Sequence, residues 1–259
     1  MAGYRIEAFP RSRRIIVDTG AAAGRRHPVH GLIEVDITRT VEILDGMSTP
    51  PSLTSCVAAS IGLAVGQVPE VHAVRDLRNR LVIFDDVDIN VMIEVELEGR
   101  SFPMNHVIRS CNTKSVVEID NELRAIKADP GSSATMSLEG AAALYFRLPR
   151  YLRSRLVGLL HRLPHKQRQL AGTVGISSVG MFGKGGGWGI GFSVQTLSII
   201  VGGTVVRPAF INGALEPRTF LHLSFTFDHD IVDGAPAARF VANARRLLEA
   251  GSALTDYPG

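Results

Sequence analysis

The sequence predicts an α+β fold: a mixed or mostly antiparallel β-sheet that carries helices on one face. Two kinds of segment support this prediction. Some alternate apolar and polar residues, as half-buried strands do, and others repeat apolar residues at helical spacing. Because nothing along the chain resembles a linker or an internal repeat, we expect residues 1–259 to form a single domain.

The composition excludes several classes of protein. With 45% apolar and 20% charged residues, the chain is not expected to be disordered. It has no run of 18 apolar residues, which a transmembrane helix needs, and no apolar stretch that would make its basic start a secretory signal. The net charge of +3 is too small to indicate a nucleic-acid partner. Cys56 and Cys111 form no CxxC pair, which favours a reducing compartment and a cytoplasmic location.

Alternation predicts three strands in the first half of the chain: 30–38, 81–84 and 87–97. Two helices are expected there as well, over 53–65 and 114–127. Ser52 and Thr113 precede these helices as N-caps, and Pro69 ends the first helix. Residues 1–30 are mixed and basic and predict no regular element.

The second half predicts further strands and a final helix. Strands are expected at 172–180, at 196–210 (two strands joined by a glycine turn) and at 219–230. A glycine-rich loop follows the first of them, and Asn212-Gly213 marks a turn. An amphipathic helix over 235–248 follows the turn at Asp233-Gly234.

The segment 141–170 departs from this pattern. It holds no acidic residue but seven cations: Arg147, Arg150, Arg153, Arg155, Arg162, Lys166 and Arg168. Leucines recur in it at three- or four-residue steps, and Pro149 and Pro164 divide it into helical pieces. The favoured interpretation is a basic helical insertion whose leucines pack on the domain and whose arginines are solvated. A polyanion site, a docking face for a partner and contact with an anionic membrane surface stay open.

The strand over 219–230 ends in the motif His-Asp-Ile-Val-Asp-Gly, which begins at His229. The strand holds the backbone of His229, and the turn at Asp233-Gly234 brings the Asp233 carboxylate back toward the imidazole. Because imidazole titrates near neutral pH, His229 is a candidate general base. The spacing alone is a weak signal, because Asp-Gly turns are common.

Ser177 and Ser178 end the strand that enters the glycine-rich loop. A hydroxyl there is placed to stabilise an oxyanion, although ordinary turn chemistry is the favoured explanation for an isolated serine pair. The glycines of the loop lack phosphate-loop spacing, so nucleotide hydrolysis is not expected. The eight histidines are scattered and form no convincing set of ligands, so no metal is expected.

Several stretches together resemble one known family. SFTFDHDIVDGAPAARFV (224–241) resembles the C-terminal signature of the dihydrolipoamide acyltransferase component of 2-oxo acid dehydrogenase complexes, and chloramphenicol acetyltransferase shares the fold and the HxxxDG core. GTVGISSVGMFG (172–183) is similar to the strand and loop with that family's oxyanion serine, and HPVHGLIEVDIT (27–38) to its early strand. The resemblance implies a chloramphenicol acetyltransferase-like two-layer sandwich.

The resemblance also implies a CoA-dependent acyltransferase. Acyl-CoA is then a substrate, and the acceptor is a thiol of the dihydrolipoyl type or a small hydroxyl compound. His229 takes the proton of the acceptor, while Ser177 of a neighbouring subunit in a homotrimer hydrogen-bonds the oxyanion. Asp233 and Gly234 support the loop beneath the histidine, Asp233 through an ion pair for which Arg13 is the candidate. The candidate CoA contacts are Ser178, Gly180 and Phe182.

Some departures from the family pattern bear on these expectations. Asp230 stands where the family usually has arginine, and we expect its side chain to point away from His229, because neighbouring strand residues alternate faces. The family's Asn-Pro-Pro-Gln stretch is replaced by GFSVQ (191–195), so CoA contacts do not transfer there. We expect no covalently bound lipoate in this chain, so that a lipoyl domain would come from another chain. The polar tail, 252–259, favours a free trimer.

Two other functions remain open. The first is a non-catalytic trimeric scaffold of the same fold, which recruits partners through 141–170. The second is a stand-alone acetyltransferase that acts on a small hydroxyl compound. Both alternatives have the same fold. In the scaffold His229 and Ser177 have no catalytic role, whereas in the acetyltransferase they are catalytic.

Overall fold

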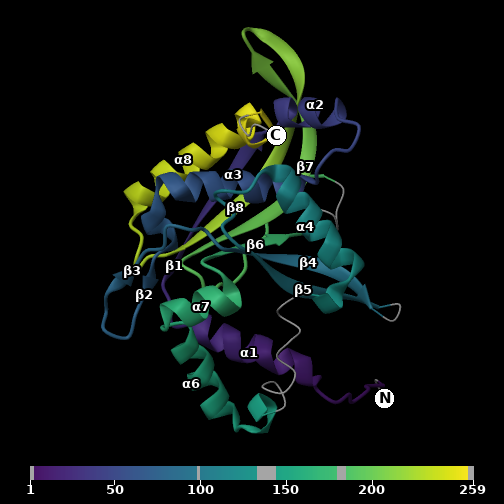
Figure 1. Ribbon diagram of the computed structural model, residues 1–259. Helices are drawn as coiled ribbons and strands as arrows, with labels where there is room; N and C mark the ends of the chain where they lie inside the picture. Colours follow the sequence, from purple (N-terminus) through teal and green to yellow (C-terminus); the bar gives the residue numbers. More distant parts are fainter. Residues whose placement is uncertain (1–2, 98–99, 133–143, 180–184, 256–259) are drawn as a thin grey trace.

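The computed structural model describes residues 3–97, 100–132, 144–179 and 185–255. A six-stranded sheet in the order β1-β8-β7-β6-β4-β5 forms one layer of the molecule (Figure 1). Its strands are β1 (Pro28–Asp36), β4 (Ile89–Leu97), β5 (Arg100–Ile108), β6 (Val174–Ser178), β7 (Leu197–Ile211) and β8 (Ala214–Asp228). The β4/β6 and β6/β7 pairs are parallel and the others are antiparallel, so the sheet is mixed. β2 (Val74–Arg75) and β3 (Leu81–Val82) form a separate two-stranded ribbon.

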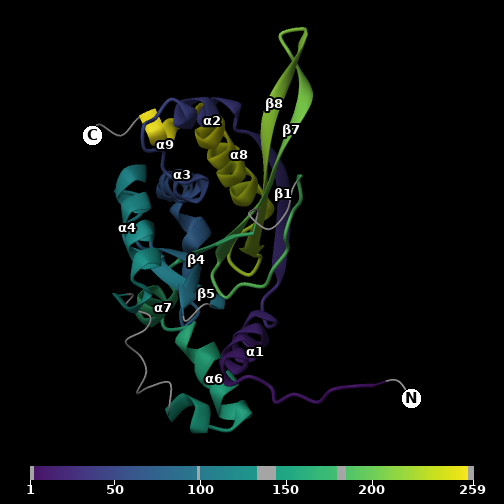
Figure 2. The ribbon, with the colours of Figure 1, turned by 90° about the vertical axis from the view of Figure 1, so that its right-hand side faces the viewer.

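The second layer consists of helices that cover one face of the sheet (Figure 2). They are α2 (Thr38–Asp45), α3 (Leu53–Gln67), α4 (Val116–Ala128), α8 (Gly234–Ala250) and the short α9 (Ser252–Thr255). Two short 3-10 helices, η1 (Pro69–His72) and η2 (Pro130–Ser132), follow α3 and α4. α3 is small and apolar almost all round because it packs between α4 and α8 as well as on the sheet. The predicted α+β class is therefore confirmed, with the core between the two layers.

The helix starts test the predicted N-caps. Ser52 caps α3 as predicted, since its hydroxyl accepts a hydrogen bond from the backbone N–H of Ser55. Thr113 was the wrong choice for α4. Ser115 caps that helix, because it alone has a glutamate, Glu118, three residues ahead with which it forms a reciprocal capping box.

Two strands differ from the sequence-based expectation. β5 lies in a stretch for which the sequence predicted no strand, because Pro103 interrupts the strand pattern there. The sheet tolerates this proline because β5 is an edge strand. β7 is one strand rather than two. Its glycine pair, Gly202-Gly203, makes a register shift against β8, and a Cβ at either glycine would collide with the backbone of residues 185–187. The predicted turn at Asn212-Gly213 is confirmed, with positive φ angles of 51° and 86°.

A group of helices lies below the sheet (Figure 2). It comprises α1 (Arg11–Ala23), α6 (Arg150–Leu160) and α7 (Pro164–Ala171). The predicted breaks at Pro149 and Pro164 are confirmed, since α6 begins after the first proline and α7 at the second. α1 lies in the stretch for which the sequence predicted no element.

The packing of α6 on α1 shows that the prediction of solvated arginines and packed leucines in the segment 141–170 was partly wrong. Arg153 is buried, and its Nε donates to Oδ2 of the fully buried Asp18 at 2.8 Å, while the hydroxyl of Tyr145 donates to the same carboxylate at 2.7 Å. Leu152 and Leu159 are instead exposed. Arg153 is not solvated because it pairs with Asp18, and these leucines face away from the domain. No helix in the described ranges is both long and apolar enough to cross a bilayer.

Candidate active site

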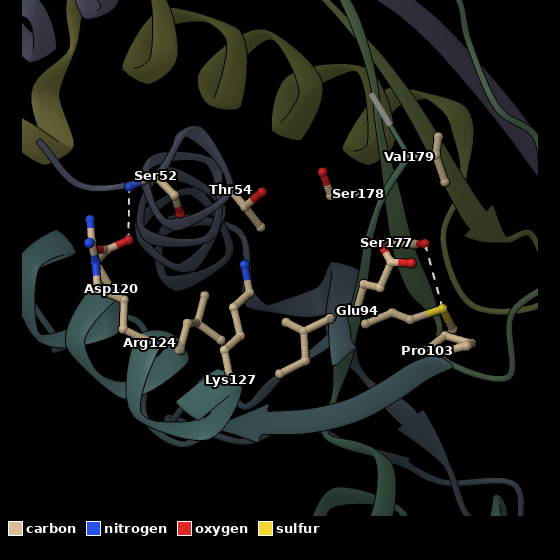
Figure 3. A pocket seen from close by; sticks show the side chains of 13 residues that line it. Ser52, Thr54, Glu94, Pro103, Asp120, Arg124, Lys127, Ser177, Ser178 and Val179 are labelled. Carbon is tan, nitrogen blue, oxygen red and sulfur yellow. Dashed lines mark hydrogen bonds and ion pairs between the residues drawn. The ribbon is translucent and has the colours of Figure 1, made fainter. Parts of the chain in front are cut away.

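A pocket of about 680 Å³ opens between the sheet and helices α3 and α4, at the end of β6 where the sequence places its serine pair (Figure 3). Its volume falls within the roughly 300–1,000 Å³ that is usual for small-molecule sites. The lining residues are Ser52, Thr54, Met92, Ile93, Glu94, Pro103, Asp120, Leu123, Arg124, Lys127, Ser177, Ser178 and Val179. The structure therefore places both predicted serines in one cavity.

Ser177 lies beside Met92 in the parallel register of β6 and β4. Its hydroxyl donates to the Sδ atom of Met92 at 3.9 Å, as the dashed line in Figure 3 shows. A thioether is a weak acceptor, so this contact holds the hydroxyl only loosely. Ser177 is thus free to turn its proton toward a stronger acceptor, such as an oxyanion.

The side of the pocket formed by α4 is charged and largely prearranged. Asp120 accepts hydrogen bonds from the backbone N–H of Ser52 at 2.8 Å and from Nε of Arg124 at 2.5 Å. Burial alone would raise the pKa of Asp120, but these hydrogen bonds and that of Ser55 hold its pKa below the usual range. Lys127 also lines the pocket, and its side chain is exposed.

The sequence analysis did not predict that Asp120, Arg124 and Lys127 belong to a site. The signal was available, because these positions recur at helical spacing on the polar side of a helix with an apolar stripe. The sequence analysis also did not predict that Glu94 lines the pocket, because a polar residue at this position is what a half-buried strand usually has. Nothing local showed that this side of β4 faces a cavity.

His229 follows the last residue of β8, and its backbone N–H donates to the carbonyl of His27 at 2.9 Å. Its side chain is 46% exposed, so the ring is accessible to a reactant. Nδ1 of His229 lies 3.9 Å from Oδ1 of Asp233, too far for a hydrogen bond. Asp233 stands at the N-cap of α8, directly before Gly234, and its side chain is 85% exposed.

The expected ion pair between Asp233 and Arg13 is not formed within the described chain. Arg13 lies near the start of α1, whereas the end of α1 approaches β8, about 15 Å further along the helix axis. The arginine that reaches this region is Arg26. Its Nη1 donates at 2.5 Å to the carboxylate of Asp228, which precedes the catalytic candidate His229.

Asp230 has partners other than His229. Its carboxylate accepts from Nδ1 of His27 at 2.8 Å and from Nη2 of Arg75 at 3.1 Å. The hydrogen bond from His27 and the positive charge of Arg75 lower the pKa of Asp230. The carboxylate next to the imidazole is therefore engaged by two basic side chains, in agreement with the expected orientation.

Ser177 and His229 do not meet within one chain. Ser177 is in register with Ile200 of β7, which in turn is in register with Ser224 of β8, five residues before His229. Two strand spacings across the sheet and five residues along it correspond to about 19 Å between the two backbones. One chain thus supplies a serine pocket and a histidine turn at different places.

Two of the predicted CoA contacts, Gly180 and Phe182, lie outside the described residues. Ser178 lines the serine pocket beside Ser177. Within the described ranges, no group of three or more histidine, cysteine or acidic side chains could hold a metal ion.

Comparison with known proteins identifies the family that the site resembles. Residues 161–255 match the model of the 2-oxoacid dehydrogenases acyltransferase (catalytic domain). This match begins inside the predicted basic insertion and includes both Ser177 and His229. The resemblance predicted from the sequence is therefore confirmed.

Relatives of the acyltransferase family align with most of the chain. The succinyltransferase component of the mitochondrial 2-oxoglutarate dehydrogenase complex of Saccharomyces cerevisiae is 25% identical over 210 residues, which are 80% of this chain and 38% of that protein. The acetyltransferase component of the pyruvate dehydrogenase complex of Rickettsia typhi is 21% identical over 84% of this chain and 47% of its own length. The chain thus spans less than half the length of these curated relatives.

Several solved structures of acyltransferases share the fold. A probable dihydrolipoamide acetyltransferase from Listeria monocytogenes superposes with a TM-score of 0.71 at 18% identity, covering 95% of this chain and 94% of the other. A truncated catalytic core of the 2-oxoacid dehydrogenase complex from Thermoplasma acidophilum gives 0.69 at 22% identity, with 96% and 99% covered. Chloramphenicol acetyltransferase gives 0.51 at 14% identity, with 95% and 98% covered. The predicted chloramphenicol acetyltransferase-like architecture is confirmed.

Proposed function

We propose that the chain is a CoA-dependent acyltransferase that moves an acyl group between CoA and a thiol of the dihydrolipoyl type. The observation that supports this most is the pairing of an accessible imidazole at the end of β8 with a loosely held hydroxyl in a substrate-sized pocket. Both residues occupy the motif positions by which the sequence resembles the acyltransferase family, and both lie within the matched residues.

The proposed reaction begins when the imidazole of His229 takes the proton of the acceptor thiol. The thiolate then attacks the carbonyl carbon of acyl-CoA, and the hydroxyl of Ser177 donates to the oxyanion of the tetrahedral intermediate. When the intermediate collapses, the bond between the acyl carbon and the CoA sulfur breaks. The imidazolium of His229 returns its proton to the CoA thiolate, so that protons and charge balance over the cycle.

This reaction needs two copies of the chain, because about 19 Å separates the two groups within one chain. The projecting end of the β7/β8 hairpin supports an assembly. The outer part of this hairpin projects beyond the rest of the sheet (Figure 1) and pairs with no third strand in the described chain. It exposes Val206, Phe210 and Leu215. A two-stranded ribbon is marginally stable in water, so a neighbouring subunit that covers this arm would stabilise it. We propose a homotrimer with its active sites between subunits.

Substitution of the histidine tests the proposed function. His229→Ala is expected to abolish CoA-dependent acyl transfer to dihydrolipoamide, while His165→Ala, which replaces an exposed histidine of α7, retains it. Size-exclusion chromatography with light scattering should show the same assembly for both variants. Unchanged turnover in His229→Ala would remove the imidazole from the reaction.

The scaffold hypothesis makes a different prediction about ligands. A ligand that binds only the folded protein raises its thermal stability, by an amount that grows with concentration over Kd. We expect CoA and acetyl-CoA to raise the melting temperature in proportion to the logarithm of their concentration. No shift at millimolar CoA would favour the non-catalytic scaffold. The acceptor, thiol or small hydroxyl compound, is then distinguished by turnover with dihydrolipoamide.

We also propose that α6 contacts an anionic membrane surface. Its outer side exposes Tyr151, Leu152, Leu156 and Leu159, with Arg150 and Arg155 beside them. Apolar side chains flanked by arginines suit the interface of an anionic bilayer. Arg150→Gln with Arg155→Gln should abolish co-sedimentation with phosphatidylglycerol vesicles, and equal sedimentation of the double variant and the wild type would contradict the proposal. Arg153 must be left intact in this test, because it pairs with Asp18.

A further inference from the structure

A second cavity, of about 190 Å³, lies where the ends of α1 and α6 meet the turn that carries His229. Basic side chains reach it from three different elements. They are Arg25 and Arg26 after α1, Arg75 of β2, and His161 and Arg162 after α6. The turn contributes Asp228 and Asp230, the residues on either side of His229.

The cavity keeps a surplus of positive charge. Its two carboxylates are already paired, Asp228 with Arg26 at 2.5 Å and Asp230 with Arg75 at 3.1 Å. Arg25 and Arg162 have no ion-pair partner among the described residues. The carboxyl ends of α1 and α6 oppose this charge, but each contributes only about half an elementary charge. The positive charge of the two unpaired guanidinium groups is therefore larger than the negative charge of the two helix ends.

Two polar atoms at this cavity are buried without a hydrogen-bond partner in the described chain: Nδ1 of His161 and Nε of Arg162. Arg162 is held in place, because its Nη2 donates to the carbonyl of Asp76 at 3.0 Å and to Oδ1 of Asn79 at 3.1 Å. Burial, with a smaller effect of Arg26, lowers the pKa of His161 to about 4, so the neutral ring can donate from one nitrogen only. Because a guanidinium always carries a hydrogen on Nε, Arg162 keeps a buried donor with no acceptor in the described chain, which is rare among buried polar groups.

We propose that this cavity, the α1–α6 anion site, binds a phosphate group. Planar guanidinium groups such as those of Arg25 and Arg162 bind phosphate oxygens through paired hydrogen bonds. The cavity is smaller than the roughly 300–1,000 Å³ of sites for drug-sized ligands, so it suits one phosphate group rather than a whole nucleotide. The site does not depend on acyl transfer, although it adjoins the turn of the proposed catalytic histidine.

Direct binding of inorganic phosphate tests the site. We expect isothermal titration calorimetry at low ionic strength to show saturable binding to the full chain. Arg25→Gln should weaken it roughly ten-fold, the usual cost of one charge-assisted hydrogen bond. Arg25 is exposed, so this substitution leaves the fold intact. Arg39→Gln removes another exposed arginine, outside the cavity, and should leave the affinity unchanged.

The same measurement can overturn the proposal. Absence of saturable binding, or equal affinities of the wild type, Arg25→Gln and Arg39→Gln, would do so. Arg25→Lys keeps the charge and should lose less affinity than Arg25→Gln. His229→Ala should bind phosphate like the wild type, so failure of the anion site and failure of the proposed acyl transfer are distinguishable.

A competition experiment identifies the source of the phosphate group. If CoA displaces inorganic phosphate from the wild-type protein and Arg25→Gln weakens CoA binding as well, the site holds a phosphate of CoA. If phosphate and CoA bind together, the site takes free phosphate or a phosphorylated compound other than CoA. Both outcomes are consistent with a phosphate site that includes Arg25, and they differ only in the molecule that supplies the phosphate group.

Discussion

Ser177 lies next to the last residue of β6, toward one end of the sheet, and His229 follows β8 at the other, so that about 19 Å separates the two backbones within one chain. Proton transfer and oxyanion stabilisation need both groups within hydrogen-bond reach of one reacting thioester. In the proposed assembly each chain therefore carries two half-sites, and a complete site joins the histidine of one subunit to the serine of the next.

Mixing two inactive variants tests this arrangement. His229→Ala lacks the base, and Ser177→Ala lacks the oxyanion donor, whose loss should lower kcat about 10²–10³-fold. If the two are unfolded and refolded together at equal amounts, random assembly pairs an intact His229 with an intact Ser177 in about a quarter of the interfaces of a cyclic assembly. We expect the mixture to regain about a quarter of the wild-type kcat per chain.

The control for this experiment is the neighbouring serine. Ser178→Ala removes a hydroxyl from the same pocket without touching Ser177 and should lower kcat much less. If the co-refolded mixture is no more active than the sum of its parents, the two residues do not share a site between subunits.

Much of the fold was predictable because it depends on local patterns. The alternation in β4 and the apolar run of α3 report directly which faces are buried, whereas the second half of β8 alternates although both its faces are buried. α1 and β5 were missed for different reasons. α1 is stabilised by a contact between Asp18 and Arg153, far apart in the sequence, and β5 contains a proline that only its edge position allows.

The candidate site was only partly predictable. The motif positions of His229 and Ser177 are visible in the sequence, but the charged wall that α4 adds to the serine pocket depends on how two layers pack. The pairing of Asp228 with Arg26, rather than Asp233 with Arg13, likewise depends on where α1 ends. The α1–α6 anion site needs three elements that are distant in the sequence, so no motif could indicate it.

Arg153 and Asp18 form the main polar contact between α6 and α1. Breaking a buried pair leaves an uncompensated charge and usually costs about 3–5 kcal/mol. Arg153→Ala should therefore destabilise the packing of these helices by about 3 kcal/mol. Because this destabilisation is confined to α1 and α6, it should be measured as faster amide hydrogen exchange in these two helices. In Arg155→Ala, which removes an exposed arginine from α6, the exchange rates should remain close to those of the wild type.

His72 is fully buried and makes the stability of the protein depend on pH. Its Nε2 donates to the carbonyl of Phe84 at 3.1 Å, and its Nδ1 lies 2.9 Å from the hydroxyl of Thr173. Burial lowers the pKa of His72 from 6.5 to about 4. In the unfolded chain the imidazole takes up a proton below its ordinary pKa, while in the folded protein it stays neutral.

The sign of the effect follows from this difference. The folded pKa is the lower one, so stability is fully present above about pH 6.5 and decreases as the pH falls toward 4. A pKa difference of this size corresponds to about 3 kcal/mol. His161, whose pKa burial also lowers to about 4, adds to the loss in the same range. Urea unfolding between pH 7.5 and 4.5 should show this decrease, and His72→Gln should reduce its slope. An identical slope in the wild type and His72→Gln would show that His72 does not couple protonation to folding.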